Sequence, residues 1–87
     1  MATQLLDRKI KLIWDFRGPA AKRTAEHYVV HLKEYVINEE LKYGIVESKV
    51  INDMHSLVLL VVAEFEMPQV RDDLKPHRGE VYLDESP

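Results

Sequence analysis

The chain has 87 residues, a formal net charge of −3 and no cysteine. This length suits one domain, so we expect residues 1–87 to fold as a single α+β unit. The lack of cysteine excludes disulfides and thiolate metal sites, and a pI of ≈ 5.8 argues against binding to duplex nucleic acid. The longest apolar run, residues 57–63, is too short to span a membrane, and the first residues lack a signal-peptide core. We therefore expect a cytoplasmic protein with no nucleic-acid and no membrane partner.

The first half of the chain predicts a strand followed by a long helix. Residues 9–16 alternate between apolar and mostly polar side chains, which is typical of a half-buried strand. From Pro19 to about Lys42 apolar residues recur at helical spacing, and the proline suits the first turn of a helix. Gly44 is the predicted C-terminal cap residue of that helix.

The second half predicts two strands, a short helix and a final strand. Residues 45–51 alternate as a strand, and residues 52–56 suit a hairpin loop. Residues 57–66 form a predicted strand that is apolar on both faces, as expected when a sheet is covered twice. A second helix is predicted from Met67 to the residue before Pro76, and a last strand over residues 79–83.

This β-α-β-β-α-β order predicts a ferredoxin-like α+β fold, with an antiparallel sheet and both helices on one face. A right-handed first crossover leaves strands one and two parallel, with strand three between them. The other face of the sheet would be bare in a monomer, although strand three carries apolar residues there. We therefore predict a homodimer that packs sheet against sheet. Residues 1–8 and 84–87 are expected to fray.

The predicted topology brings several polar residues to one end of the sheet. The loop after strand one, the hairpin, the start of the first helix and the segment before strand four all meet there. His31 lies one helical turn further away. The residues expected at that end are Asp15, Arg17, His27, His55, His77 and Arg78.

The histidines give the sequence its main chemical signal, because histidine transfers protons and binds metals near neutral pH. His27 and His31 are four residues apart and share a helix face, a spacing that can hold one metal ion. Tyr28 occupies the position where the zinc-protease motif has a glutamate, so we predict no metal site. Three interpretations stay open for the pair: histidines at the edge of the core, proton transfer, and metal ligation.

The remaining polar residues suggest an acid–base site for an anion. Asp15 either orients His27, the candidate general acid or base, or simply caps the next turn. Arg17 and Arg78 either bind a carboxylate or phosphate together or are ordinary solvated loop residues. His55 and His77 complete the candidate ligand-binding set, although a histidine in a hairpin loop, such as His55, is more often an ordinary turn residue.

Two stretches resemble the dimeric α+β barrel superfamily, and within it the YciI-like proteins most. They are Ala25-Glu26-His27-Tyr28-Val29-Val30-His31-Leu32 and Val61-Val62-Ala63-Glu64-Phe65-Glu66. Two other segments match no YciI pattern and look like signatures of a separate uncharacterised bacterial family. These are Trp14-Asp15-Phe16-Arg17-Gly18-Pro19 and Lys75-Pro76-His77-Arg78-Gly79.

The resemblance implies a homodimer with a cleft between sheet and helices, and a His-Asp pair in which His27 or His31 supplies the imidazole. Three functions are then open. The first is a cofactor-independent acid–base enzyme acting on a small anionic molecule. The second is a non-catalytic ligand-binding or regulatory dimer, and the third is a histidine metal-binding protein. Fold alone does not decide among them.

Overall fold

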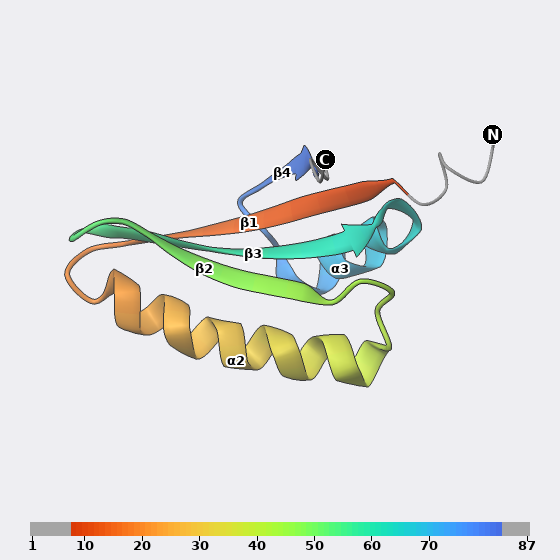
Figure 1. Ribbon diagram of the computed structural model, residues 1–87, viewed down its shortest axis with the longest axis horizontal. Helices are drawn as coiled ribbons and strands as arrows, with labels where there is room; N and C mark the ends of the chain where they lie inside the picture. Colours follow the sequence, from red (N-terminus) through yellow and green to blue (C-terminus); the bar gives the residue numbers. More distant parts are fainter. Residues whose placement is uncertain (1–7, 83–87) are drawn as a thin grey trace, which may run out of the picture.

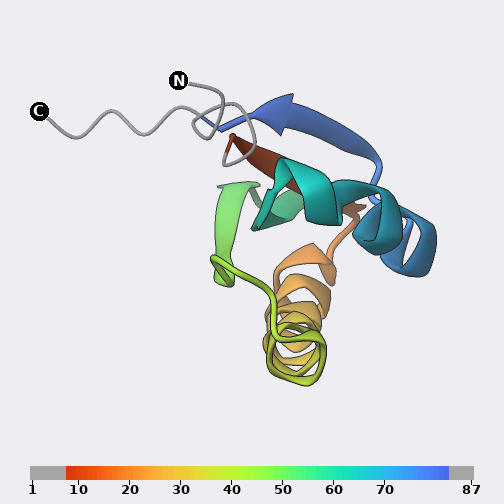
Figure 2. The ribbon, with the colours of Figure 1, turned by 90° about the vertical axis from the view of Figure 1, so that its right-hand side faces the viewer.

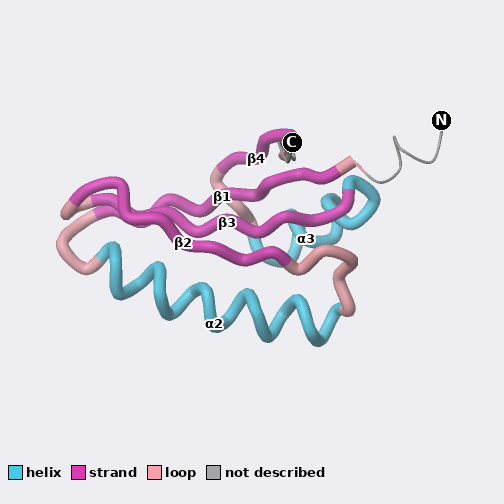
Figure 3. Tube along the Cα trace, viewed as in Figure 1, coloured by secondary structure: helices cyan, strands magenta, loops and turns pink. Residues whose placement is uncertain are grey.

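The computed structural model describes residues 8–82, which form a four-stranded antiparallel sheet with two helices on one of its faces (Figures 1 and 3). The predicted α+β class is confirmed. The elements in chain order are β1 (Lys9–Arg17), α2 (Ala21–Glu39), β2 (Ile45–Asn52), β3 (His55–Ala63), a 3₁₀ turn η1 (Glu64–Glu66), α3 (Met67–Leu74) and β4 (Arg78–Val81).

The strand order is β2-β3-β1-β4, and every neighbouring pair is antiparallel. β1 and β2 both pair with β3, so they run parallel to each other with β3 between them, as the ferredoxin-like prediction requires. The helices α2 and α3 lie on the same side of the sheet (Figure 2). The residues of alternating strand positions therefore divide between a helix face and an open face.

The helix face holds the hydrophobic core. Trp14 of β1, Leu60 of β3 and Leu32 of α2 belong to one buried cluster, and Leu60 and Leu32 have no exposed surface. Trp14 also donates a hydrogen bond from Nε1 to the backbone oxygen of Leu74 at 2.9 Å. This bond ties the end of α3 to the middle of β1, which places the chain that follows α3 beside the site described below.

The open face carries alternating apolar and charged residues. Ile13 and Val61 are buried there although no helix covers them. Near the end of β3, Lys9 places its ammonium 4.8 Å from the ring centre of Tyr43. Lys9 pairs with Ala63 of β3, and Tyr43 precedes β2, so this contact crosses β3 and helps to cover Ala63. Part of the apolar surface of β3 is thus covered within one chain.

Several boundaries differ from the sequence prediction by one or two residues, among them the start of β4 at Arg78 rather than Gly79, and three differ in ways that affect the turns. β3 ends at Ala63, because the chain turns at η1, where Glu66 accepts a hydrogen bond from the Ala63 N–H at 3.0 Å. The hairpin turn is shorter than predicted, since β3 begins at His55. α2 ends at Glu39, and the left-handed cap residue is Glu40 rather than Gly44.

Gly44 has a different role from the predicted cap. Its φ is +63°, and a Cβ at this position would lie 2.7 Å from Cγ1 of Val36. Only glycine avoids both the strained backbone and this contact. Gly44 therefore lets the chain pass close beneath α2 as it enters β2.

The predicted fraying concerns residues that mostly lie outside the described range, namely 1–7 and 84–87. Arg8 is described, and its carbonyl oxygen accepts a hydrogen bond from the Glu64 N–H at 2.8 Å. No helix within residues 8–82 has the length and apolar character needed to cross a membrane.

Candidate functional site on the open face

A carboxylate on the open face organises the candidate site. Asp15 lies near the end of β1, and its side chain is 14% exposed. Arg78, the first residue of β4, donates from Nε to Oδ2 at 3.0 Å and from Nη2 to Oδ1 at 3.1 Å. His55, the first residue of β3, places Nε2 2.8 Å from Oδ1 of Asp15. Three strands thus contribute one side chain each to the site.

These contacts keep Asp15 ionised. The hydrogen bonds from Arg78, and then the one from His55, lower the pKa of Asp15 from 3.8 to about 2, against the opposing effect of burial. The same bond to Asp15 raises the pKa of Arg78. A two-pronged guanidinium–carboxylate contact of this kind also fixes the plane of the carboxylate. Asp15 is therefore a rigid, charged acceptor at neutral pH.

The ionised carboxylate determines the tautomer of its histidine partner. A carboxylate can only accept, so Nε2 of His55 must donate the proton in this contact. In the neutral ring Nδ1 then carries a lone pair and no proton. In its neutral form His55 therefore has a donor at Nε2, fixed by Asp15, and an acceptor at Nδ1.

His77 holds the backbone of the site. Its Nδ1 accepts a hydrogen bond from the Asp15 N–H at 2.8 Å, and its own N–H donates to the Ile13 oxygen at 2.9 Å. β4 begins only at Arg78, so the His77 imidazole, rather than a backbone carbonyl, accepts the hydrogen bond of the Asp15 N–H. His77 thus extends the β1–β4 ladder by one bond and fixes the position from which Asp15 projects.

Residues 14–19 and 75–79 meet at this site. α3 ends at Lys75, a left-handed cap residue with φ of 52°, and Pro76 prevents the helix from continuing. The chain then returns along β1, so that His77 and Arg78 arrive beside Asp15. These two segments, far apart in the sequence, therefore form one structural unit.

Arg17 is a second arginine at this end of the open face. It pairs with His55 in the β1–β3 register, and both residues lie on the open face. Directly opposed side chains on one face have Cβ atoms about 4.5–5.5 Å apart. Arg17 is exposed and forms no ion pair within residues 8–82. It is thus placed to attract an anion to His55.

Arg78 is less available to an anion than the sequence suggested. Besides Asp15, it faces Glu80 at 3.5 Å, and Glu80 in turn lies 3.5 Å from Lys11. A chain of alternating charges therefore runs along β4 and β1 on the open face. The predicted joint binding of one anion by Arg17 and Arg78 stays a prediction, and the geometry favours Arg17 for that role.

His27 and His31 lie on the other side of the sheet. Both are exposed residues of α2, and the His31 ring stacks at 5.7 Å on that of Tyr28. Asp15 projects from the open face, because its neighbours Trp14 and Phe16 belong to the core on the helix face. The predicted pairing of Asp15 with His27 is therefore not formed, and His55 takes that place.

The contact between His55 and Asp15 was not predicted from the sequence. The available signal was the alternation of residues 9–17, which puts Asp15 and the helices on opposite faces. A histidine that lies opposite Arg17 in the neighbouring strand shares the open face with Asp15. The register that places it there became visible only in the folded sheet.

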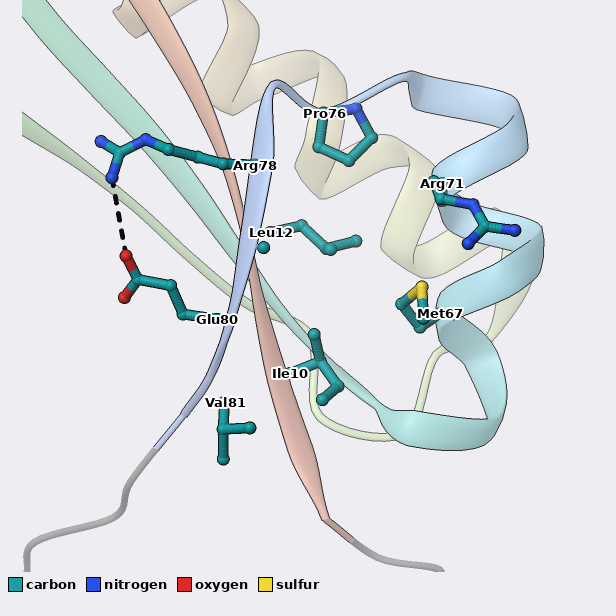
Figure 4. Close-up of a pocket in the computed structure, with 9 residues that line it drawn as sticks. Ile10, Leu12, Met67, Arg71, Pro76, Arg78, Glu80 and Val81 are labelled. Atoms are coloured by element: carbon teal, nitrogen blue, oxygen red, sulfur yellow. Dashed lines mark ion pairs between the residues drawn. The ribbon is translucent and has the colours of Figure 1, made fainter.

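A separate apolar pocket of ≈ 340 Å³ lies between β4 and α3 (Figure 4). Leu12 and Met67 point into it, whereas Arg78 and Glu80 point away, toward the open face. Gly79 lies against the Leu12 side chain that lines this pocket, since a Cβ on residue 79 would lie 3.3 Å from Cδ2 of Leu12. The pocket contains no acid–base pair and is separated from Asp15 and His55 by the sheet.

No group of three or more His, Asp or Glu side chains within residues 8–82 is arranged to hold a metal ion. His27 and His31 remain a two-residue motif. No protein-family model, curated protein or solved structure matches the chain. The function therefore has to be argued from the geometry of the site.

Proposed function

We propose that this protein is a cofactor-independent enzyme that transfers a proton to or from a small anionic molecule. His55 is the general acid or base, Asp15 orients it, and Arg17 attracts the anion. The single observation that supports this proposal is the 2.8 Å contact between His55 Nε2 and Asp15 Oδ1, with Asp15 itself fixed by Arg78. Carboxylate–imidazole pairs of this geometry serve as acid–base centres in many enzymes.

The contacts support this assignment over a purely structural one in one respect. An ion pair that only stabilised the sheet would be complete with Arg78 and Asp15. The additional histidine donates from Nε2 to Asp15, and its side chain remains 15% exposed. A partly exposed imidazole with a fixed tautomer can accept a proton from a bound carbon acid or hydroxyl group.

A non-catalytic, anion-binding protein is the second candidate, and the unpaired Arg17 favours it. The same guanidinium would bind a carboxylate beside His55 without any proton transfer. Membership of the YciI-like proteins and a sheet-to-sheet homodimer also stay predictions. A second subunit on the open face would enclose the site and exclude water from it.

Deuterium exchange tests the enzymatic proposal without a known substrate. Small keto acids, such as pyruvate, are incubated with the protein in deuterated buffer, and loss of the C–H signal is followed by proton NMR. We expect exchange above the buffer rate, loss of that excess in His55→Gln, and a reduction of about 10²-fold or more in Asp15→Asn.

His27→Gln is the matched control, because it changes an exposed histidine on the opposite side of the sheet. Equal loss in His27→Gln and His55→Gln would contradict the assignment. Chemical-shift changes at residues 15–17 and 55 on adding pyruvate, with no exchange at any pH between 6 and 9, would favour the binding protein instead.

A further inference from the structure

The outer edge of β2 pairs with no other strand of residues 8–82. β2 stands at one end of the strand order, and its residues 47–52 are all exposed. It is eight residues long, contains no proline, and its one irregularity lies near the hairpin, between Val50 and Asn52. Neither helix lies beyond β2 (Figure 2). Proteins usually protect such an edge, because it can pair with another strand.

The sequence of β2 is self-complementary about Ser48. Reading outward from this serine, Glu47 is matched by Lys49, and Val46 by Val50. In an antiparallel pair related by a two-fold axis through Ser48, each residue before the axis lies opposite its match from the other chain. Glu47 would then lie opposite Lys49 of the second copy, and Lys49 opposite Glu47.

The register of the sheet puts each matched pair on a common face. Glu47 and Lys49 pair with Leu59 and Leu57 of β3 and so belong to the open face. The two valines belong to the helix face, with Ser48 between them. The two-fold pairing therefore gives two ion pairs on one face and two valine–valine contacts on the other, without any like charges opposed.

Two exposed hydrophobic side chains lie on β2 itself. Val50 is 54% exposed and Ile51 is 46% exposed. On α2, the exposed Val30 and Ile37 lie roughly 140–160° around the helix from the buried Leu32, so they face away from the sheet and do not extend this edge.

Within residues 8–82, β2 thus contributes two of the seven exposed large hydrophobic residues, Val50 and Ile51. The opposite edge, β4, is only four residues long, and Val81 is its exposed apolar side chain. The hydrophobic surface and the charge pattern point to the same edge.

We infer that the outer edge of β2 binds β2 of a second copy of this chain, forming a continuous eight-stranded sheet. A second copy fits better than an unrelated strand, because the complement of each β2 residue is already present in β2 itself. Neither Glu47 nor Lys49 has an ion-pair partner within residues 8–82 of its own chain. The pairing gives a partner to both, and it leaves Asp15 and His55 outside the interface.

Sedimentation equilibrium of the full chain tests this inference through a charge swap. We expect a mass of about twice 10.2 kDa for the unchanged protein at micromolar concentration. Glu47→Lys or Lys49→Glu alone opposes like charges twice, by symmetry, and should raise the dissociation constant about ten-fold or more. The double variant Glu47→Lys/Lys49→Glu restores the pattern in reverse and should restore association.

Val50→Lys and Val81→Lys form the matched pair of edge variants. Both replace an exposed valine on an edge strand, but only the first lies on β2, so only the first should yield a monomer. Circular dichroism confirms that each variant is folded. A monomeric unchanged protein, a double swap that fails to restore association, or a dimer that survives Val50→Lys would overturn the inference. The last result would place any dimer on another surface, such as the open face.

Discussion

The two faces of the sheet use the same four strands for different purposes. The helix face is uniformly apolar where Trp14, Leu60 and Leu32 meet, and its residues are almost fully buried. The open face combines the buried Ile13 and Val61 and half-buried leucines with a network of charges centred on Asp15. Hydrophobic burial drives folding, whereas polar groups need specific partners to be tolerated in a partly buried place. The comparison indicates that one face stabilises the fold and the other is free to carry chemistry.

The largest expected difference in stability between the two faces is that between substitutions of two adjacent leucines of β3. Leu60 points to the core and has no exposed surface, while its neighbour Leu59 lies on the open face and is only half-buried. We expect Leu60→Ala to lower the free energy of unfolding by about 2–5 kcal/mol, since it leaves a cavity. Leu59→Ala should cost clearly less. Urea unfolding of both variants measures the difference, and equal losses would show that the open face is also a packed core.

Trp14 links the two faces, because its indole lies in the core while its neighbour Asp15 holds the site. Trp14→Phe keeps an aromatic ring but removes the 2.9 Å hydrogen bond to the Leu74 oxygen. We expect a loss of about 1–2 kcal/mol, from that bond and from the smaller ring. Amide hydrogen exchange of Lys75, His77 and Arg78 should also accelerate. If exchange there is unchanged, the segment is positioned by β1–β4 pairing alone.

The smallest expected change in the free energy of unfolding is that of Asp15→Asn, and this change depends on pH. Its folded pKa of about 2 lies below the ordinary value of 3.8. The ionised form is therefore favoured by folding, and this contribution is present above pH 4 and is lost as the pH falls toward 2. Asp15→Asn should cost about 1 kcal/mol at pH 7, and the gap to the unchanged protein should narrow between pH 4 and pH 2.

Asp53→Asn is the control for that experiment, since Asp53 lies in the exposed hairpin turn and forms no ion pair within residues 8–82. Unfolding is followed in urea from pH 2 to pH 7 for all three proteins. A gap for Asp15→Asn that stays constant over this range would mean that the carboxylate is not stabilised by Arg78 and His55 in solution.

Part of the candidate site was accessible from the sequence. The topology predicted that Asp15, His55, His77 and Arg78 meet at one end of the sheet, and their contacts confirm that they meet. The predicted partner of Asp15, His27, was wrong, because residues at the same end of the sheet can occupy opposite faces of it. His27 and His31 attracted attention as a helical pair, although their helix lies across the sheet from Asp15.

The sequence by itself determined the periodicity of each element, and with it the ferredoxin-like order and the division of β1 into an apolar and a polar face. These are local properties, since they depend on residues two to four positions apart. Only the tertiary structure decided the register of β3 against β1 and the return of the chain after α3. Those choices join residues 40 to 63 positions apart, as in the contacts of Asp15 with His55 and Arg78. They depend on how the whole core packs, and no local pattern contains that information.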